Sequence, residues 1–146
     1  MWVGDLRIGP WEAATIGTFF QIPTNMSSGN YSGVWYNLEG YQIYHKDSGY
    51  NDRAQLKIDI NQSQLNSINS HIKSNDKWMA SYHCTHFAMN AWNLVAPDAA
   101  KLSAGLIPTP DGLKTNIRTK TGHTNTGTVP YFVPVHYRLS IQHLVQ

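Results

Sequence analysis

The chain of 146 residues has little cysteine and little charge. A single cysteine excludes an intramolecular disulfide framework, so we expect the fold to stand without covalent cross-links. Charged residues make up only 14% of the chain, and the formal net charge is +2. Because lysine and arginine are scattered, with no basic run or basic helix face, nucleic acid is not an expected partner.

Long apolar runs are also missing. The sequence has no stretch of about 18 apolar residues, so we expect no membrane span. We see no secretory signal peptide either, because polar residues, glycine and proline interrupt the first apolar stretch. The location of the protein stays open, and export by a dedicated secretion machine is compatible with this sequence.

The apolar content is enough for one compact domain covering residues 1–146. Hydrophobic residues make up 41% of the chain, and five Trp and eight Tyr add large contact areas. Residues 13–22 and 33–44 are rich in β-branched and aromatic residues, which favour strands. Residues 54–60 alternate between apolar and polar side chains, a pattern that predicts a half-buried strand.

Three helices are predicted after these strands. The first begins after Asn61, whose side chain forms a capping box with Gln64, and ends near Asn75. The second begins near His83 or Cys84 and ends before Pro97. Its predicted buried stripe has spacings of i, i+4, i+7 and i+11, and consists of Cys84, Ala88, Ala91 and Val95, with Phe87 beside them.

The third helix follows Thr109, a favourable N-cap, with Pro110 at the first helical position and Leu113 and Ile117 facing inward. A polar Gly/Thr loop over residues 119–128 and a final strand over residues 131–141 complete the pattern. Strands first, helices next and a last strand predict an α+β fold, with a mainly antiparallel sheet and helices packed on one side.

Cys84 is the strongest candidate for chemistry. At the start of a helix, a thiol lies at the positive end of the helix dipole and beside unpaired backbone N–H groups, both of which favour the thiolate. A thiolate is the reactive form of a cysteine nucleophile. The alternative is structural, because free cysteine is often a small buried side chain that fills space in a core.

A cysteine nucleophile needs a base, usually a histidine. Of the seven histidines, His86 lies about 200° around the helix from Cys84 and is a poor candidate. His83 precedes the helix with its direction undetermined, and His71 is interpreted as a boundary residue of the preceding helix. His143 lies near the end of the sequence, and the remaining candidates are His45, His123 and His136.

Other chemistries find less support. A lone cysteine beside His83 and His86 lacks the paired ligand spacing of a zinc site, so we expect no metal and no cofactor. The nine acidic residues are dispersed, with no carboxylate pair set apart for glycoside hydrolysis. No glycine-rich phosphate loop is present.

Four segments of the sequence resemble one enzyme family. The chain carries His83-Cys84-Thr85-His86-Phe87 continuing to Asn93, the segment from Ile107 to Ile117 with its Thr-Pro-x-x-Leu pattern, and two strand-like segments, residues 14–19 and 33–39. Together they are similar to papain-like cysteine peptidases of the NlpC/P60 superfamily, in particular its circularly permuted branch. The resemblance spans most of residues 11–118.

This resemblance implies a papain-like core and a thiol hydrolase that cleaves amide bonds, typically in peptidoglycan peptides, with Cys84 as the nucleophile. An antibacterial effector with an inhibitor protein as a second partner fits the same reading. Two alternatives stay open: an acyltransferase or lipid hydrolase on the same permuted fold, and a catalytically inactive binding domain.

The sequence departs from the family at the base. In the permuted branch the catalytic histidine commonly opens the first strand, whereas residues 1–44 contain no histidine. The base then lies outside this sequence, or another histidine replaces it, or the site is inactive. His123 and His136 follow Cys84 by 39 and 52 residues, as in the non-permuted order, and are the preferred replacements.

Overall fold

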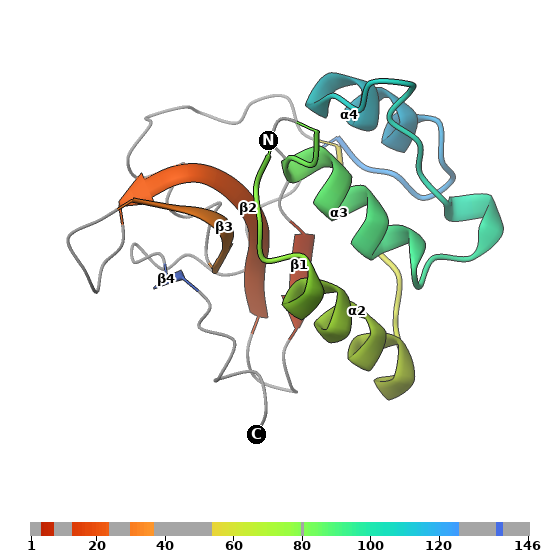
Figure 1. The fold of residues 1–146 in the computed structure, drawn as a ribbon. Helices are drawn as coiled ribbons and strands as arrows, with labels where there is room; N and C mark the ends of the chain where they lie inside the picture. Colours follow the sequence, from red (N-terminus) through yellow and green to blue (C-terminus); the bar gives the residue numbers. More distant parts are fainter. Residues whose placement is uncertain are drawn as a thin grey trace.

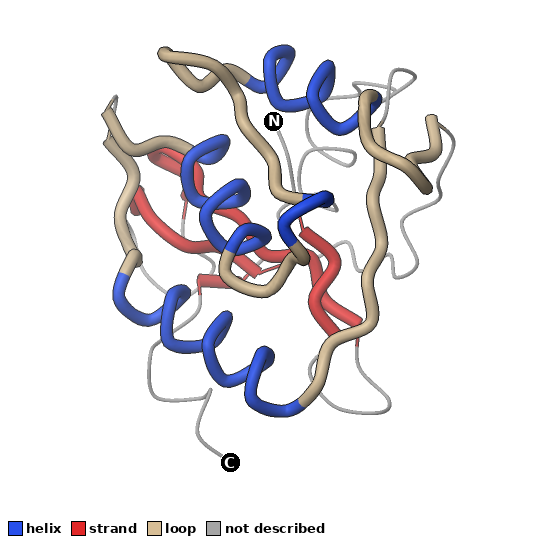
Figure 2. The backbone as a smooth tube through the Cα atoms, turned by 90° about the vertical axis from the view of Figure 1, so that its right-hand side faces the viewer, coloured by secondary structure: helices blue, strands red, loops and turns tan. Residues whose placement is uncertain are grey.

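A computed structural model describes residues 4–7, 13–23, 30–36, 54–79, 81–125 and 137–138. The elements in chain order are β1 (Gly4–Arg7), β2 (Ala13–Pro23), β3 (Asn30–Tyr36), α2 (Gln62–Ser74), α3 (Cys84–Asn93), the 3-10 helix η1 (Asp98–Ala100), α4 (Pro110–Arg118) and β4 (Tyr137–Arg138). Figure 1 shows the strands on one side of these helices, and Figure 2 shows the helices in front of the strands after a quarter turn.

The described strands pair in the order β1-β2-β3-β4, and every pairing is antiparallel. Gly4 pairs with Ile16 between β1 and β2, and the β2–β3 register shifts between Phe19 and Ile22. Within the final strand predicted over residues 131–141, the structure describes only β4. Assignment of the whole chain to an α+β fold with a papain-like core stays a prediction.

The predicted starts of two helices are confirmed. Asn61 Oδ1 accepts a hydrogen bond from the Gln64 amide at 2.9 Å, and Gln64 Oε1 accepts one from the Asn61 amide, also at 2.9 Å. Thr109 Oγ1 accepts a hydrogen bond from the Gly112 amide at 3.0 Å at the start of α4. These bonds use backbone N–H groups that have no partner inside the helix, and they fix where each helix begins.

Residues 54–60 differ from the prediction of a strand. Only Gln55 is in a bridge, to Thr124, and no ladder continues along the segment. The alternation nonetheless persists in burial, since Lys57 and Asp59 are exposed while Ile58 lies partly buried. The apolar side chains at alternate positions pack against the helices here, so the alternating pattern does not require a paired neighbouring strand.

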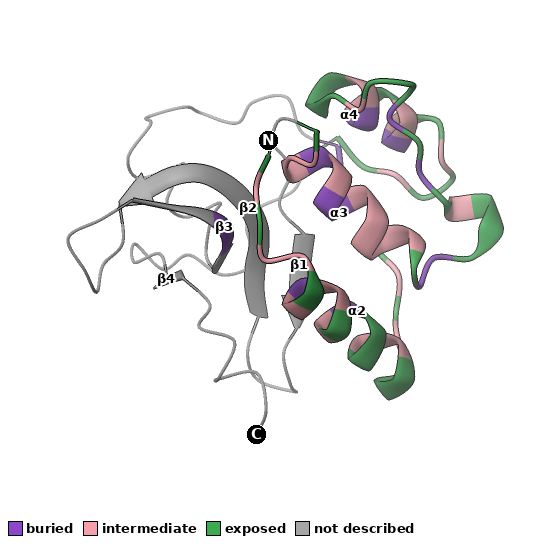
Figure 3. Cartoon of the chain, in the orientation of Figure 1, coloured by how far each residue is buried: buried purple, intermediate pink, exposed green. Residues whose placement is uncertain are grey.

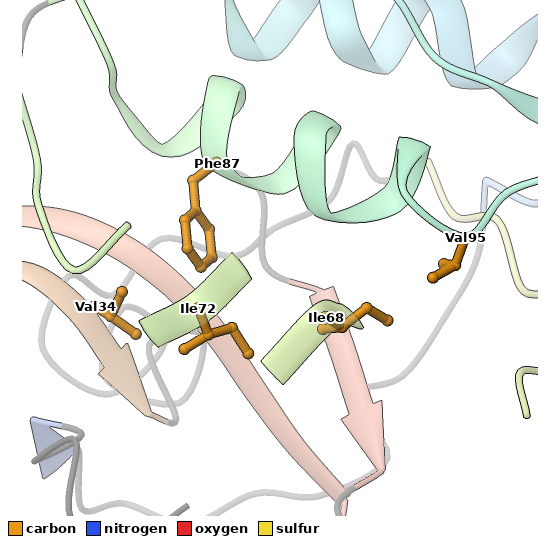
Figure 4. Packing of buried hydrophobic residues seen from close by; sticks show 5 residues of the cluster. All are labelled: Val34, Ile68, Ile72, Phe87 and Val95. Atoms are coloured by element: carbon orange, nitrogen blue, oxygen red, sulfur yellow. The ribbon is translucent and has the colours of Figure 1, made fainter. Parts of the chain in front are cut away.

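Two apolar clusters form the described core, with α3 between them. The first consists of Val34, Ile68, Ile72, Phe87 and Val95. Figure 4 shows Phe87 pointing from α3 toward Val34 and Ile72. The second consists of Ala54, Leu102, Ala104, Leu113 and Ile117, with Met89 and Trp92 of α3 packed against it. Helix α3 therefore touches β2, α2 and α4, which makes it the central helix of the described residues.

The predicted stripe is confirmed at Phe87, Ala88 and Val95, which are buried, and is wrong in leaving out Thr85. Thr85, Phe87 and Ala88 are buried, whereas Cys84 and Ala91 are only half-buried (Figure 3). The helix itself ends at Asn93, so the buried Val95 lies just beyond it. The end of α3 is also covered in part, because Trp92 Nε1 donates to the Ala100 carbonyl and Asn93 Nδ2 donates to the Leu102 carbonyl. No helix among the described residues has the length and apolar character needed to cross a bilayer.

Candidate functional site

Cys84 is the first residue of α3 and is half-buried. Its neighbour His83 is the N-cap: His83 Nδ1 accepts a hydrogen bond from the Thr85 amide at 3.4 Å, and the His83 carbonyl accepts one from the Phe87 amide at 3.1 Å. Among the described residues, no acceptor takes the amides of Cys84 and His86. The start of α3 thus presents a thiol beside two backbone N–H groups that have no acceptor among the described residues.

Three aromatic side chains gather at the same turn of α3. The rings of His83 and His86 meet edge to face, with their centroids 4.8 Å apart. His86 also stacks on Tyr82, with centroids 5.7 Å apart, and Lys77 Nζ lies 5.4 Å from the centroid of the Tyr82 ring. We call Tyr82, His83 and His86 the ring cluster.

Several polar atoms at this turn are buried without a hydrogen-bond partner. They are the Tyr82 hydroxyl, Thr85 Oγ1 and His86 Nδ1. Burial lowers the pKa of His86, and the nearby His83 lowers it further. The lowered pKa agrees with the burial of His86 Nδ1, which has no hydrogen-bond partner among the described residues.

His71 is held by protein groups on both ring nitrogens. Its Nε2 donates to the Phe87 carbonyl at 3.3 Å, and its Nδ1 accepts from Asn75 Nδ2 at 3.2 Å. Burial lowers the pKa of His71, and the bond to the Phe87 carbonyl opposes that effect in part. His71 therefore acts as a link between α2 and α3, in agreement with its interpretation as a boundary residue.

Of the two preferred histidine bases, the structure describes only His123. His123 Nδ1 donates to the Lys120 carbonyl at 2.9 Å, in the turn after α4. No hydrogen bond joins Cys84 Sγ to His123 or to any other described histidine. His45, His136 and His143 lie outside the described residues, so their proposed roles stay predictions.

A metal centre finds no support at this turn. Within the described ranges, no group of three or more His, Cys, Asp or Glu side chains is arranged to hold a metal ion. His83 and His86 contact each other through their rings, and His83 Nδ1 is already used by the helix cap.

Sequence reasoning missed the ring cluster and the burial of Thr85. The cluster had no reliable signal in the sequence, because Tyr82 lies before the N-cap of α3 and its contact with His86 depends on how the chain enters the helix. Thr85, which is 0% exposed, had none, since a threonine beside a candidate nucleophile gives no sign in the sequence of lying in the core.

Compared with known proteins, the chain matches no family model, no curated protein and no solved structure.

Proposed function

We propose that this protein is a cysteine-dependent hydrolase that cleaves amide bonds, with peptidoglycan peptides as the substrate class. The observation that carries the proposal is the position of Cys84, a half-buried thiol on the first residue of α3. The substrate class rests on the sequence resemblance to the NlpC/P60 superfamily.

The start of α3 supplies two features that such chemistry requires. The helix dipole places partial positive charge beside the thiol, which favours attack by a thiolate. The amides of Cys84 and His86, for which the described part of the chain offers no acceptor, are donors for an oxyanion that develops next to the sulfur. Removing one oxyanion donor in a hydrolase typically slows catalysis by about 10²–10³-fold, so these amides would make a substantial contribution to the rate.

The general base of the reaction is the open part of the proposal. His123 and His136 remain the preferred candidates, followed by His45. His83 is a weaker one, because its Nδ1 lone pair is already engaged by the hydrogen bond from the Thr85 amide.

Replacement of Cys84 tests the proposal directly. We expect Cys84→Ser to abolish hydrolysis of a peptidoglycan peptide while moving the melting temperature little, because serine nearly preserves the shape but needs stronger activation. Ala91→Ser is the matched control, since it places the same hydroxyl at another half-buried position of α3. Hydrolysis retained by Cys84→Ser would remove Cys84 as the nucleophile.

The alkylation rate of Cys84 is a second test of the proposal, and it does not depend on the substrate. Cys84 is the only cysteine, so iodoacetamide labelling reports on it alone. We expect labelling to stay fast below about pH 7, as for an activated thiolate. Labelling that becomes fast only in alkaline solution would indicate an inert thiol.

One observation favours a second candidate function, a catalytically inactive binding domain. No described histidine forms a hydrogen bond with Cys84. The discriminating experiment replaces His45, His123 and His136 by alanine one at a time. Loss of both hydrolysis and fast alkylation at one position identifies the base, whereas three unchanged variants favour the binding domain.

A further inference from the structure

Lys77 lies in the short segment that joins α2 to α3 and leads to Cys84. Met79 and Tyr82 form an antiparallel bridge in this segment: the Met79 amide donates to the Tyr82 carbonyl at 3.1 Å, and the Tyr82 amide donates to the Met79 carbonyl at 2.9 Å. An antiparallel pair sets the residues before it opposite the residues after it. Lys77, two residues before Met79, therefore comes to the same side of the bridge as Cys84, two residues after Tyr82. Figures 1 and 2 both show this segment running up to the first turn of α3.

The ammonium group of Lys77 is held against an aromatic ring of the candidate site. Lys77 Nζ lies 5.4 Å from the centroid of the Tyr82 ring, within the distance of about 6 Å at which a cation is attracted to a ring face. Tyr82 in turn stacks on His86, which belongs to the first turn of α3. The ring cluster therefore connects the lysine to the turn that begins with Cys84.

Lys77 keeps its charge available for another molecule. The side chain is exposed, and no carboxylate pairs with it among the described residues, where Lys101 and Lys114 are paired with Asp98 and Asp111. The adjacent Asp76 is directed to β3, where its Oδ1 accepts from the Val34 amide. An ammonium group has three donors, so contact with one ring face leaves others for an acceptor.

The charge near Cys84 has one sign. Residues 77–97 contain no aspartate and no glutamate, and Lys77 is their only lysine or arginine. The start of α3 adds the partial positive charge of the helix dipole and the amides of Cys84 and His86, which have no acceptor among the described residues. An ammonium group and free backbone donors on one side of a thiol favour an anionic group that accepts hydrogen bonds, as a carboxylate does.

We propose that Lys77 is a specificity-determining residue of the candidate site and binds a carboxylate of the peptide substrate, next to the amide bond that Cys84 attacks. This inference rests on the proposed function, and it narrows the substrate class to peptides with a free carboxylate beside the cleaved bond. Lys77 takes no part in bond breaking. Its contribution is the same in the bound substrate and in the transition state, so its loss raises KM and leaves kcat nearly unchanged.

A pair of alkylating reagents tests the attraction of a carboxylate to Cys84 without any peptide. Iodoacetate carries a carboxylate where iodoacetamide carries a neutral amide, and both react when the thiolate displaces iodide. Cys84 is the only cysteine, so the ratio of the two rate constants reports on this site alone. We expect the ratio of iodoacetate to iodoacetamide to be higher for the protein than for 2-mercaptoethanol, and to fall as salt is added.

Replacement of Lys77 assigns the attraction to its charge. Lys77→Gln should lower the ratio by about threefold or more, as expected for loss of one unit charge near the reagent, and Lys77→Arg should keep most of it. Lys101→Gln is the matched control: it removes the same charge at the other end of α3, where Trp92 donates to the Ala100 carbonyl next to Lys101. This control should leave the ratio unchanged.

Two outcomes of the alkylation experiment would overturn the proposal. An unchanged ratio in Lys77→Gln would mean that the ammonium group does not act on a carboxylate at this site. Equal slowing of both reagents would mean that Lys77 acts on the thiolate alone and does not select the ligand. All three variants should keep the parent's circular dichroism spectrum, because both lysines are exposed.

Hydrolysis carries the test to the substrate. We compare two forms of one peptidoglycan peptide, with the carboxylate beside the cleaved amide either free or amidated. The parent should prefer the free carboxylate in kcat/KM, and Lys77→Gln should lose that preference by about threefold or more through a higher KM. Equal preference in the parent and in Lys77→Gln would contradict the proposal. If the parent hydrolyses neither form, the proposed function fails, whereas the alkylation ratio still decides whether Lys77 binds a carboxylate beside Cys84.

Discussion

His71 on α2 donates a hydrogen bond from Nε2 to the backbone carbonyl of Phe87 on α3, with the two atoms 3.3 Å apart. The two rings also lie close, with centroids 5.2 Å apart. Because Phe87 is in the first core cluster, this bond ties the helix that carries Cys84 to the core through its second turn. Asn75 completes the arrangement by donating to His71 Nδ1. Protonation of His71 at Nδ1 would place a ring N–H donor against the side-chain N–H donor of Asn75.

The first prediction concerns the pH dependence of stability. Burial lowers the pKa of His71 in the folded protein, so the unfolded chain binds the proton more strongly. This contribution to the free energy of unfolding is complete above about pH 6.5 and decreases as the pH falls toward the folded pKa. We expect urea denaturation between about pH 7.5 and pH 5 to show falling stability.

His71→Gln separates this group from the others, because glutamine retains an N–H donor but does not titrate. Its stability should depend less on pH than that of the parent. His86→Gln is the matched comparison, since the pKa of His86 is lowered in the same direction. An unchanged pH slope in both variants would show that neither ring is the source.

The second prediction concerns the core cluster around α4. Ile117 is 0% exposed, and truncation to alanine removes buried methyl groups and leaves a cavity. We expect Ile117→Ala to lower the free energy of unfolding by about 2–5 kcal/mol. Ile107→Ala, at a position 80% exposed, should change it by no more than about 0.5 kcal/mol. Similar losses in the two variants would contradict the described burial.

The sequence predicted best the features that neighbouring residues determine. The capping box of Asn61 and Gln64 and the Thr109 cap depend on residues three apart, so their signals are complete in a short segment. The buried positions Leu113 and Ile117 follow from the helical period that starts at that cap.

Features that depend on distant segments were not predictable in the same way. Asp76 Oδ1 accepts a hydrogen bond from the Val34 amide at 2.9 Å, a bond between residues 42 positions apart. Residues 54–60 have the period of a strand, but whether a neighbour pairs with them depends on the arrangement of the whole chain. The base of the candidate site could not be predicted for the same reason, because a base is defined by its distance from Cys84 in the fold and not by its spacing in the sequence.

The third prediction concerns Gly112 in the first turn of α4. Alanine favours a helix over glycine by about 1 kcal/mol, so helix propensity alone predicts stabilisation. A Cβ atom at this position would, however, lie 2.7 Å from the backbone oxygen of Ala104. We expect Gly112→Ala to lower the melting temperature, because a backbone atom cannot move aside as a side-chain end can. Ser70→Ala, on the exposed face of α2, should be neutral or slightly stabilising, and a melting temperature raised by Gly112→Ala would contradict the close packing.

The fourth prediction separates the cap at the start of α3 from its chemistry. His83 Nδ1 accepts from the Thr85 amide at 3.4 Å, which is a long bond, and asparagine is a preferred N-cap residue. We expect His83→Asn to be at least as stable as the parent, and His83→Ala to lose about 0.5–2 kcal/mol. Because no described hydrogen bond joins the His83 ring to Cys84, His83→Asn should also keep the parent's rate of iodoacetamide labelling. A stable His83→Asn variant whose labelling slows by about tenfold or more would assign the His83 ring to activation of Cys84 and remove its interpretation as a cap alone.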